Sequence, residues 1–556
     1  MQPELFLARS GAPSIRWGRI PLEDVEDPWQ AASDFVSAQQ VERAKVVVLF
    51  GLGLGYRVRR LRQLGVTPLI FEPCAAIADL VVEHAPEMLE GVPLFSDFSS
   101  LRTHLLEQMK TDDAVVLLVP PAYRMAFPEM HDQLVEQLRE SHALATLRRN
   151  GVVERSGLIV RNTLRNLGHL ADLPSATGLG KPLAGTPAFI VSAGPSLDRN
   201  VEALAHAAKC GAILAVNTAA PVLAARGIPM DAVVCVEGLR VSDALEAAAP
   251  HAASSLFDLS THPDNLHAGS SRSMAFLAGG PRFAPLASAL GLQPLAYGPS
   301  VATAALSLAF QMGADPIVLV GQDLAFSEGR MYATGTGREA VRVEIEGDLL
   351  RFDYGEMLMA RFREGGVKTP STHRPFVWTE GWGGGRVPAT HDLVSFRRWF
   401  ESVAYHFRQQ RRFINATEGG ASIQGFAEES LETLLQEMKP RTDDLQRSIR
   451  EASPLPLAQV EKVIADIHNS ALPVRESARR WLQAKSESRR RSLAEEVRQA
   501  ARRAPMVNAA AEGAITAVLD DPGIQGAAQE RKLFEIIAEA ASDVLELSAK
   551  TKRRAK

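Results

Sequence analysis

A short Gly-Pro-Ser turn offers the clearest chemistry in this sequence. Within the segment 188–203, the residues Gly194, Pro195 and Ser196 lie between an apolar run and a run with helical spacing. The first amides of a helix are unpaired and carry a partial positive charge, so the amides of Ser196 and Leu197 could bind a phosphate that approaches closely over Gly194. Alternatively, Ser196 only caps the helix. We expect phosphate binding, because ligands of open α/β sheets bind beyond the carboxyl ends of the strands.

Further polar residues follow other apolar runs, where parallel strands would end at the same edge of a sheet. Asn217 and Thr218 could orient a sugar or a base, or they only cap the helix that follows. Glu237 could hold ribose hydroxyls, bind a metal ion or remain solvated. Polar residues after a buried run are typical of a ligand site. The remaining candidates for nucleotide binding are Ser300, in a second Gly-Pro-Ser loop, and Gly321, Gln322 and Asp323.

A glycine-rich turn near the N-terminus is a second candidate site. Gly51, Gly53 and Gly55 stand between an apolar run and a helical pattern, and Glu72 ends the next apolar run, where a Rossmann-type fold places a ribose-binding carboxylate. This arrangement resembles the nucleotide-binding start of a methyltransferase domain. The alternative is that the glycines only allow a tight turn between strand and helix.

Two α/β domains are needed to position these turns. Short apolar runs alternate with helical patterns twice along the chain, which predicts two parallel sheets. A linker rich in Pro and Gly follows Leu173, and beyond about Gly425 the segments are helical and heavily charged. We therefore predict an α/β protein with a Rossmann-like N-terminal domain (1–173), a Rossmann-like central domain (174–425) and an all-helical C-terminal domain (426–556). The predicted strands are 45–50, 67–71 and 114–119 in the first sheet and 188–192, 212–216, 232–236, 273–277 and 316–320 in the second.

Composition excludes several classes of protein. The 556 residues are 46% hydrophobic and 23% charged, as in soluble globular proteins, and the formal net charge of -4 gives no basic field for a nucleic acid. The three cysteines have no CxxC spacing, which argues against a disulfide framework or a zinc cluster. No signal peptide pattern opens the sequence, and no window approaches the roughly 18 apolar residues of a membrane span. We expect a cytoplasmic protein without a membrane span.

Several ordered motifs resemble the motility-associated factor (Maf) family of flagellin glycosyltransferases. The likeness spans most of residues 45–425, and the central motifs also resemble the MptE-like domain, an archaeal 6-hydroxymethylpterin diphosphokinase. One departure is Glu237, where an aspartate would be expected after the third strand of the central domain. The motifs are GLGLGY (51–56), FEP (71–73), PPAY (120–123), GPSLD (194–198), AVNTA (215–219), GPSVA (298–302), GADPIVLVGQDLAFSEGRMYATG (313–335) and INATEGGASIQG (414–425).

The resemblance implies transfer of a nonulosonic acid, of the pseudaminic or legionaminic type, from a CMP-activated donor to Ser or Thr of flagellin. It also implies that the central domain is similar to CMP-dependent bacterial sialyltransferases. On that basis Gly194, Pro195 and Ser196 would contact the CMP phosphate and Asn217 the donor, while residues 321–323 would line the nucleotide side of the pocket. No cofactor is implied with certainty, and a divalent metal ion is possible.

The acceptor hydroxyl would need a general base with a pKa near the working pH, such as a histidine or a perturbed carboxylate. The catalytic candidates are Asp323, His373 and His391. The two histidines lie in the segment after Asp323, where the sialyltransferase resemblance places the base. His262 is a further option, and any of these histidines could be an ordinary surface or capping residue. Trp382, in the glycine-rich segment 379–390, fits either a mobile lid that contacts the acceptor or a plain surface loop.

Two other functions remain open from the sequence. A pterin or other nucleotide phosphotransferase would use the Gly-Pro-Ser turn for ATP. A non-catalytic flagellin-binding factor would not depend on the pocket at all.

Overall fold

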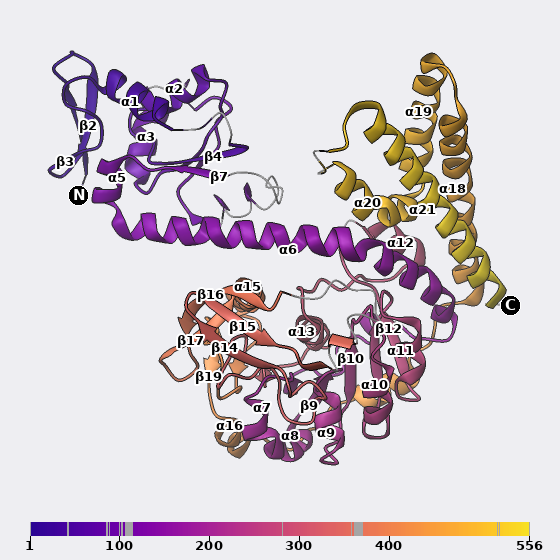
Figure 1. The fold of residues 1–556 in the computed structure, drawn as a ribbon. Coiled ribbons are helices and arrows are strands. Elements are labelled where there is room, and N and C mark those ends of the chain that lie inside the picture. Colours follow the sequence, from indigo (N-terminus) through magenta and orange to yellow (C-terminus); the bar gives the residue numbers. More distant parts are fainter. Residues whose placement is uncertain are drawn as a thin grey trace. The chain divides into compact units, whose positions relative to one another are not determined.

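The computed structural model describes residues 2–39, 41, 44–84, 87, 89–98, 100–101, 104–105, 115–280, 282–356, 359–360, 371–519, 521 and 523–554. The chain divides into two compact units, Met1–Asn150 and Gly151–Lys556 (Figure 1). Helix α6 (Pro128–Asn166) contributes residues to both units. The α/β class with parallel sheets is confirmed. The division into three domains at 173 and 425 stays a prediction.

The first unit contains a parallel sheet of four strands in the order β6-β5-β4-β7. Its strands coincide with the three predicted apolar runs, with β6 as an additional short strand. A separate antiparallel sheet of three strands precedes it. The elements are β1 (Pro3–Leu7), β2 (Pro13–Trp17), β3 (Ile20–Pro21), α1 (Pro28–Ser37), β4 (Val46–Phe50), α2 (Tyr56–Gln63), β5 (Leu69–Phe71), α3 (Ala75–His84), β6 (Leu94–Phe95), β7 (Val115–Leu118) and α5 (Pro121–Ala126).

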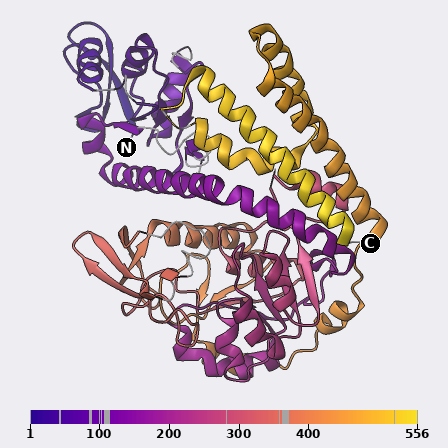
Figure 2. The same ribbon diagram turned by 45° about the vertical axis from the view of Figure 1, so that its right-hand side comes forward.

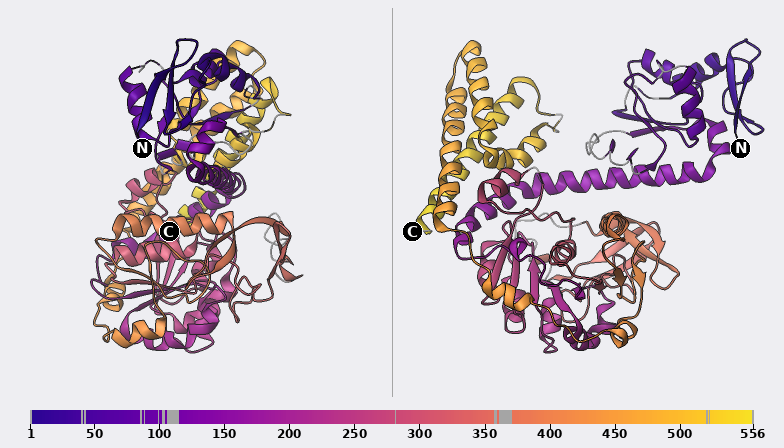
Figure 3. Two further views of the ribbon diagram at one scale, coloured as in Figure 1. Left: turned by 90° about the vertical axis from the view of Figure 1, so that its left-hand side faces the viewer. Right: turned by 180° about the vertical axis from the view of Figure 1, so that it is seen from behind.

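The second unit is built on a parallel sheet of eight strands in the order β12-β11-β10-β9-β8-β13-β18-β19. Strands β8 to β12 and β13 are fully or almost fully buried, which explains why they read as continuous apolar runs. Helices lie on both sides of the sheet (Figure 3). The strands are β8 (Ala188–Val191), β9 (Ala212–Val216), β10 (Ala232–Cys235), β11 (Ser255–Asp258), β12 (Ser273–Phe276), β13 (Ile317–Val320), β18 (Phe413–Asn415) and β19 (Ala427–Glu428). The helices between these strands are α7 (Leu197–Asn200), α8 (Leu204–Cys210), α9 (Ala220–Ala224), α10 (Ser242–Ala248), α11 (Pro263–Ala268), α12 (Ala284–Leu290), α13 (Val301–Gln311) and α15 (His391–Phe407).

The sequence did not predict the whole of this sheet. Strands β11 and β18 were missed, and β19 lies beyond Gly425, where no strand was expected. A four-stranded antiparallel sheet inserted after β13 was also missed, because most of its side chains are exposed or half-buried and leave no apolar run. Its strands are β14 (Arg342–Glu346), β15 (Leu349–Asp353), β16 (His373–Glu380) and β17 (Arg386–Thr390).

The C-terminal region is helical, as predicted. Helices α18 and α21 pack along each other, and α19 and α20 complete the group (Figure 2). Trp481 of α18 stacks on Phe534 of α21, with ring centroids 4.0 Å apart. The helices are α16 (Leu431–Glu437), α17 (Leu445–Glu451), α18 (Leu457–Gln483), α19 (Glu487–Arg502), α20 (Pro505–Leu519) and α21 (Gly526–Arg554). No helix within the described residues is long and apolar enough to cross a membrane.

Candidate functional site

The order of the strands places a topological switch point between β8 and β13. From β8 the chain proceeds outward through β9 to β12, and it then returns to β13 on the opposite side of β8. The loops that leave β8 and β13 therefore diverge at the carboxyl edge of the sheet. In open α/β sheets, ligands bind in the crevice at such a point.

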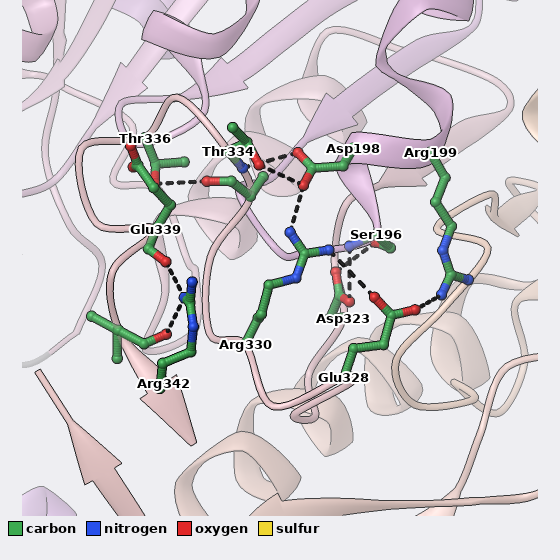
Figure 4. A network of polar contacts seen from close by, with 12 residues as sticks. Ser196, Asp198, Arg199, Asp323, Glu328, Arg330, Thr334, Thr336, Glu339 and Arg342 are labelled. Atoms are coloured by element: carbon green, nitrogen blue, oxygen red, sulfur yellow. Dashed lines mark hydrogen bonds and ion pairs between the residues drawn. The ribbon is translucent and has the colours of Figure 1, made fainter. Parts of the chain in front are cut away.

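The two loops predicted to form a site meet here. The amide of Gly194 donates to the carbonyl of Gly321 at 2.9 Å, and the Ser192 hydroxyl donates to Gln322 Oε1 at 2.6 Å. Asp323, the next residue of the loop after β13, accepts two hydrogen bonds from Ser196. The Ser196 hydroxyl donates to Asp323 Oδ2 at 2.6 Å, and the Ser196 amide donates to Oδ1 at 3.2 Å (Figure 4).

These bonds occupy the amides that the sequence assigned to a phosphate. The Ser196 amide is bound to Asp323, and the Leu197 amide donates to the carbonyl of Gly194 at 3.1 Å. Helix α7 has only four residues, so its dipole is short. Ser196 is 3% exposed and Asp323 4% exposed. Contact between a phosphate and Ser196 therefore requires Asp323 to release these two hydrogen bonds.

Asp323 has the properties of a group that can exchange a proton near neutral pH. Burial raises the pKa of its carboxyl to about 6, against the lowering effect of the hydrogen bonds from Ser196. Buried carboxyl groups with a strongly shifted pKa are candidates for catalysis.

A third loop, residues 415–421, lies against the same carboxyl group and was not among the predicted site residues. The amide of Gln322 donates to Thr417 Oγ1 at 3.2 Å, and the amide of Ala421 donates to the carbonyl of Asp323 at 2.7 Å. Gly420 has φ +69°, and a Cβ there would lie 2.1 Å from the Asp323 carbonyl oxygen. The two consecutive glycines after an apolar run were the available signal.

Strained backbone gathers around this junction. Within the described residues, the non-glycine residues with positive φ are Leu324 (52°), Glu328 (57°) and Glu418 (59°). All three belong to the loops that follow β13 and β18. Such conformations persist only where the surroundings enforce them, and they are frequent at functional sites.

Two asparagines on α6 fix neighbouring loops at the carboxyl edge of the sheet. Asn162 donates from Nδ2 to the carbonyls of Gly238 and Ser260, each at 3.0 Å. Asn166, one helical turn later, donates to two further carbonyls in residues 259–261 at 3.0 and 2.7 Å. Both asparagines are fully buried. The loops after β10 and β11 are therefore held by the helix, a role that the sequence did not suggest.

The other predicted nucleotide contacts also stand at this edge. Asn217, at the end of β9, is 3% exposed, and its Oδ1 has no hydrogen-bond partner within the described residues. Ser300 is the N-cap residue of α13, which packs against β8, β9 and β10, and its Oγ is likewise without a partner among them. Thr218 follows Asn217 and is half-buried. Glu237 makes a local contact, in which Oε1 accepts from the amide of Leu239 at 3.3 Å.

The candidate histidines are not hydrogen-bonded to Ser196 or Asp323 in the described structure. His373 is exposed on β16, where its Nε2 lies 3.4 Å from Glu346. The opposite end of β16, Glu380, bonds the loop beside Asp323 through Ser422. Seven residues of extended strand, about 23 Å, separate His373 from that end. His373 therefore lies far from Asp323.

The other two histidines occupy helix starts. His391 is the first residue of α15, and its Nδ1 is buried without a partner among the described residues. His262 caps α11, accepting from the amide of Asp264 at 3.2 Å. His262 thus has the capping role considered from the sequence.

Trp382 is tied to the third loop rather than extended into solvent. Its indole N–H donates to the carbonyl of Asn415 at 2.9 Å, and its amide donates to the carbonyl of Gly420 at 2.9 Å. The glycine-rich turn 381–385 is thereby joined to the loop that contacts Asp323.

The N-terminal glycine loop binds side chains of its own unit. Glu72 accepts from the amides of Leu52 at 2.7 Å and Cys74 at 2.9 Å, and also from the Tyr123 hydroxyl at 2.9 Å. The amide of Gly53 donates to the same hydroxyl at 2.8 Å. Glu72 is fully buried, so its carboxyl group does not face a crevice where ribose hydroxyls could reach it.

Two glycines of this loop are required by the close approach of side chains. A Cβ on Gly51 would lie 2.3 Å from the Tyr123 ring, and a Cβ on Gly53 would lie 2.0 Å from Glu23 Oε1. The N-cap residue of α2 is Gly55, at φ 84°. The loop thus forms the tight turn between strand and helix that was the alternative interpretation, and Tyr123 and Glu23 fill the space beside it.

Glu72 gives a testable pH dependence. Burial raises its pKa to about 7, so between pH 4.5 and 7 the folded state holds a proton that the unfolded state has lost. Stability from this group is present below pH 4.5 and is lost as the pH rises through 7, by on the order of 3 kcal/mol. We expect Glu72→Gln to remove this pH dependence. The measurement is hydrogen exchange of β4 and the loop at pH 5 and 7, corrected for the intrinsic rates. An unchanged difference between the two pH values would show that Glu72 does not titrate in this range.

Among the described residues, no group of three or more His, Cys, Asp or Glu side chains is arranged to hold a metal ion. The divalent metal ion considered from the sequence therefore has no candidate cluster of ligands among these residues.

The fold and the site together define an α/β protein whose polar loops meet at the switch point of a parallel sheet. Residues 161–329 match the family model described as 6-hydroxymethylpterin diphosphokinase MptE-like. The whole chain is similar to the solved structure of MAf glycosyltransferase from Magnetospirillum magneticum AMB-1, with a TM-score of 0.55 and 14% sequence identity. The similarity covers 100% of this chain and 92% of the other. A search of curated proteins found no match. The resemblance to the Maf family is thus confirmed at the level of the fold.

Proposed function

We propose that this protein is a cytoplasmic glycosyltransferase that moves a nonulosonic acid, of the pseudaminic or legionaminic type, from a CMP-activated donor to Ser or Thr of flagellin. The central observation is that the loops after β8 and β13 meet at the switch point through Ser196 and Asp323. The fold of the Maf glycosyltransferase and the MptE-like match support the proposal. It includes a Rossmann-like central domain similar to CMP-dependent sialyltransferases.

The carboxyl edge of the sheet offers hydrogen-bonding capacity for the nucleotide. Asn217 Oδ1 is a buried acceptor without a partner among the described residues, and the hydroxyl of Ser300 at the same edge can donate or accept. A buried polar atom without a partner costs free energy, which a ligand can recover. Ribose hydroxyls or the amino group of cytosine would supply donors to Asn217.

Asp323 is the general base that the geometry favours. It is bound to Ser196 at the switch point, and its pKa of about 6 leaves it mostly ionised at neutral pH, able to accept the proton of the acceptor hydroxyl. When Asp323 turns to the acceptor, the amide and hydroxyl of Ser196 become available to the departing phosphate. His391 is the second candidate because its Nδ1 has no partner among the described residues. His373 is disfavoured by its distance from Asp323.

A transfer assay tests this function. Purified protein, flagellin and a CMP-activated nonulosonic acid should give a mass increment on flagellin. Because Ser196 would stabilise the leaving phosphate, Ser196→Ala should slow transfer by about 100-fold, as for the loss of one anion-stabilising donor. The exposed Ser288→Ala on α12 is the matched control and should act as wild type. If a competent flagellin remains unmodified with every plausible donor, the proposal is wrong.

A second function is favoured by the family model over residues 161–329. A pterin diphosphokinase would release AMP from ATP without flagellin, which the same preparation can test. If pocket variants keep flagellin binding and motility intact, the protein is instead a non-catalytic binding factor.

A further inference from the structure

Four charged side chains form a cluster beside the Ser196–Asp323 pair, and none of them was among the predicted site residues. Asp198 and Arg199 come from α7, while Glu328 and Arg330 come from the loop after β13. Figure 4 shows the Glu328 carboxylate directed toward both arginines.

Glu328 is held by two guanidinium groups. Arg199 Nη2 lies 2.5 Å from Glu328 Oε1, and Arg330 Nη2 lies 3.4 Å from Oε2. One carboxylate is therefore shared between two arginines, an arrangement suited to anion recognition.

Each arginine is also fixed by a second partner that does not involve Glu328. Arg199 Nη1 donates to the carbonyl of Glu418 at 2.7 Å, and Arg330 Nη1 donates to Asp198 Oδ2 at 2.6 Å. Asp198 in turn accepts from the amide and hydroxyl of Thr334, each at 2.9 Å. The two guanidinium groups would therefore keep their positions if Glu328 left.

Glu328 is the replaceable member of the cluster. Its side chain is 54% exposed, against 22% for Asp198. A carboxylate from solution could take its place without leaving the arginines unpaired.

Arg199 is also close to the proposed reaction centre. A Cβ built on Gly419 would lie 3.1 Å from Ser196 Cβ, 3.6 Å from Arg199 Nη1 and 3.9 Å from Asp323 Oδ1. The guanidinium group, the serine and the carboxyl group thus flank the same glycine.

We propose that Arg199 and Arg330 bind the carboxylate of the transferred sugar, and that Glu328 occupies this position until the sugar displaces it. This inference rests on the proposed function, because a nonulosonic acid carries a carboxylate beside the carbon that is transferred. The arginines then select acidic sugars over neutral ones.

The test compares two probes by calorimetry on the full chain, CMP and CMP-N-acetylneuraminic acid, because their difference reports the sugar. Arg199→Gln should weaken binding of the sugar nucleotide about tenfold and leave CMP unchanged. Glu328→Gln should tighten binding of the sugar nucleotide several-fold, since it frees both arginines. Arg351→Gln, which breaks an exposed pair with Glu344 on the antiparallel sheet, is the matched control.

The possible outcomes separate the two proposals. In two outcomes the cluster only holds the loop after β13 against α7. Either both site variants bind the sugar nucleotide as wild type does, or Glu328→Gln weakens the binding of both probes equally. The carboxylate site is then wrong, while binding of CMP by the wild type keeps the proposed function. If the wild type binds neither probe, both proposals are overturned.

Discussion

Asp323→Ala should lower the rate of glycosyl transfer by at least about 100-fold without weakening the binding of CMP. The loss follows from removing the proposed general base, whose contribution is typically 10²–10⁴-fold. Binding of CMP should persist or tighten, because the amide and hydroxyl of Ser196 lose the carboxylate that now occupies them. The measurements are the transfer rate and the Kd for CMP.

The wild-type rate should also depend on pH. A general base works in its ionised form, so transfer should rise with pH through about 6, the pKa of Asp323. The residual rate of Asp323→Ala should lack this rise. Asp466→Asn, which alters an exposed pair on α18, is the control. A variant that loses CMP binding and transfer together would show that Asp323 supports the structure of the site and is not the base.

The sequence was sufficient to place the two principal loops at one edge of a sheet. Strands such as β8 and β13 are buried on both faces, so their residues form uninterrupted apolar runs that can be recognised without neighbours. The polar residues that follow them had to emerge at the carboxyl edge. That Gly194 and Gly321 would be hydrogen-bonded to each other also required the strand order, which a single sequence does not state.

The sequence could not show how the polar groups of each turn are satisfied. Asp323 is 127 residues from Ser196, and Tyr123 is 70 residues from Gly53, yet each provides the bond that a phosphate or nucleotide was expected to make. A glycine-rich turn after a strand has free amides only if no side chain from elsewhere reaches them. Propensity and spacing predict the turn. Tertiary contacts decide whether its amides are free to bind a ligand.

The same reasoning explains the missed arginine cluster. Arg199 and Arg330 were each one charge in a polar stretch, where a solvated side chain is the ordinary expectation. Their role in the cluster depends on contact with Glu328, which lies 129 residues from Arg199 in the sequence. Ion pairs between distant segments leave no periodic pattern in the sequence.

Gly420→Ala is expected to slow transfer by about 100-fold, whereas Gly227→Ala should leave it near the wild-type rate. Both glycines have positive φ, +69° and +66°, so alanine imposes a similar backbone strain of about 1–2 kcal/mol at each. They differ in their surroundings. A Cβ on Gly420 would lie 2.1 Å from the carbonyl oxygen and 2.4 Å from the Cα of Asp323, while nothing lies within 4 Å of a Cβ on Gly227.

The clash at Gly420 involves backbone atoms, so no side-chain rotation can relieve it, and Asp323 or the loop 415–421 must move. A displacement of about 1 Å in a catalytic group can cost about 100-fold in rate. Transfer assays and thermal melting of both variants measure the effect. Equal loss of transfer in the two variants would attribute the effect to backbone strain alone, and full activity of Gly420→Ala would mean that the position of Asp323 does not matter for the reaction.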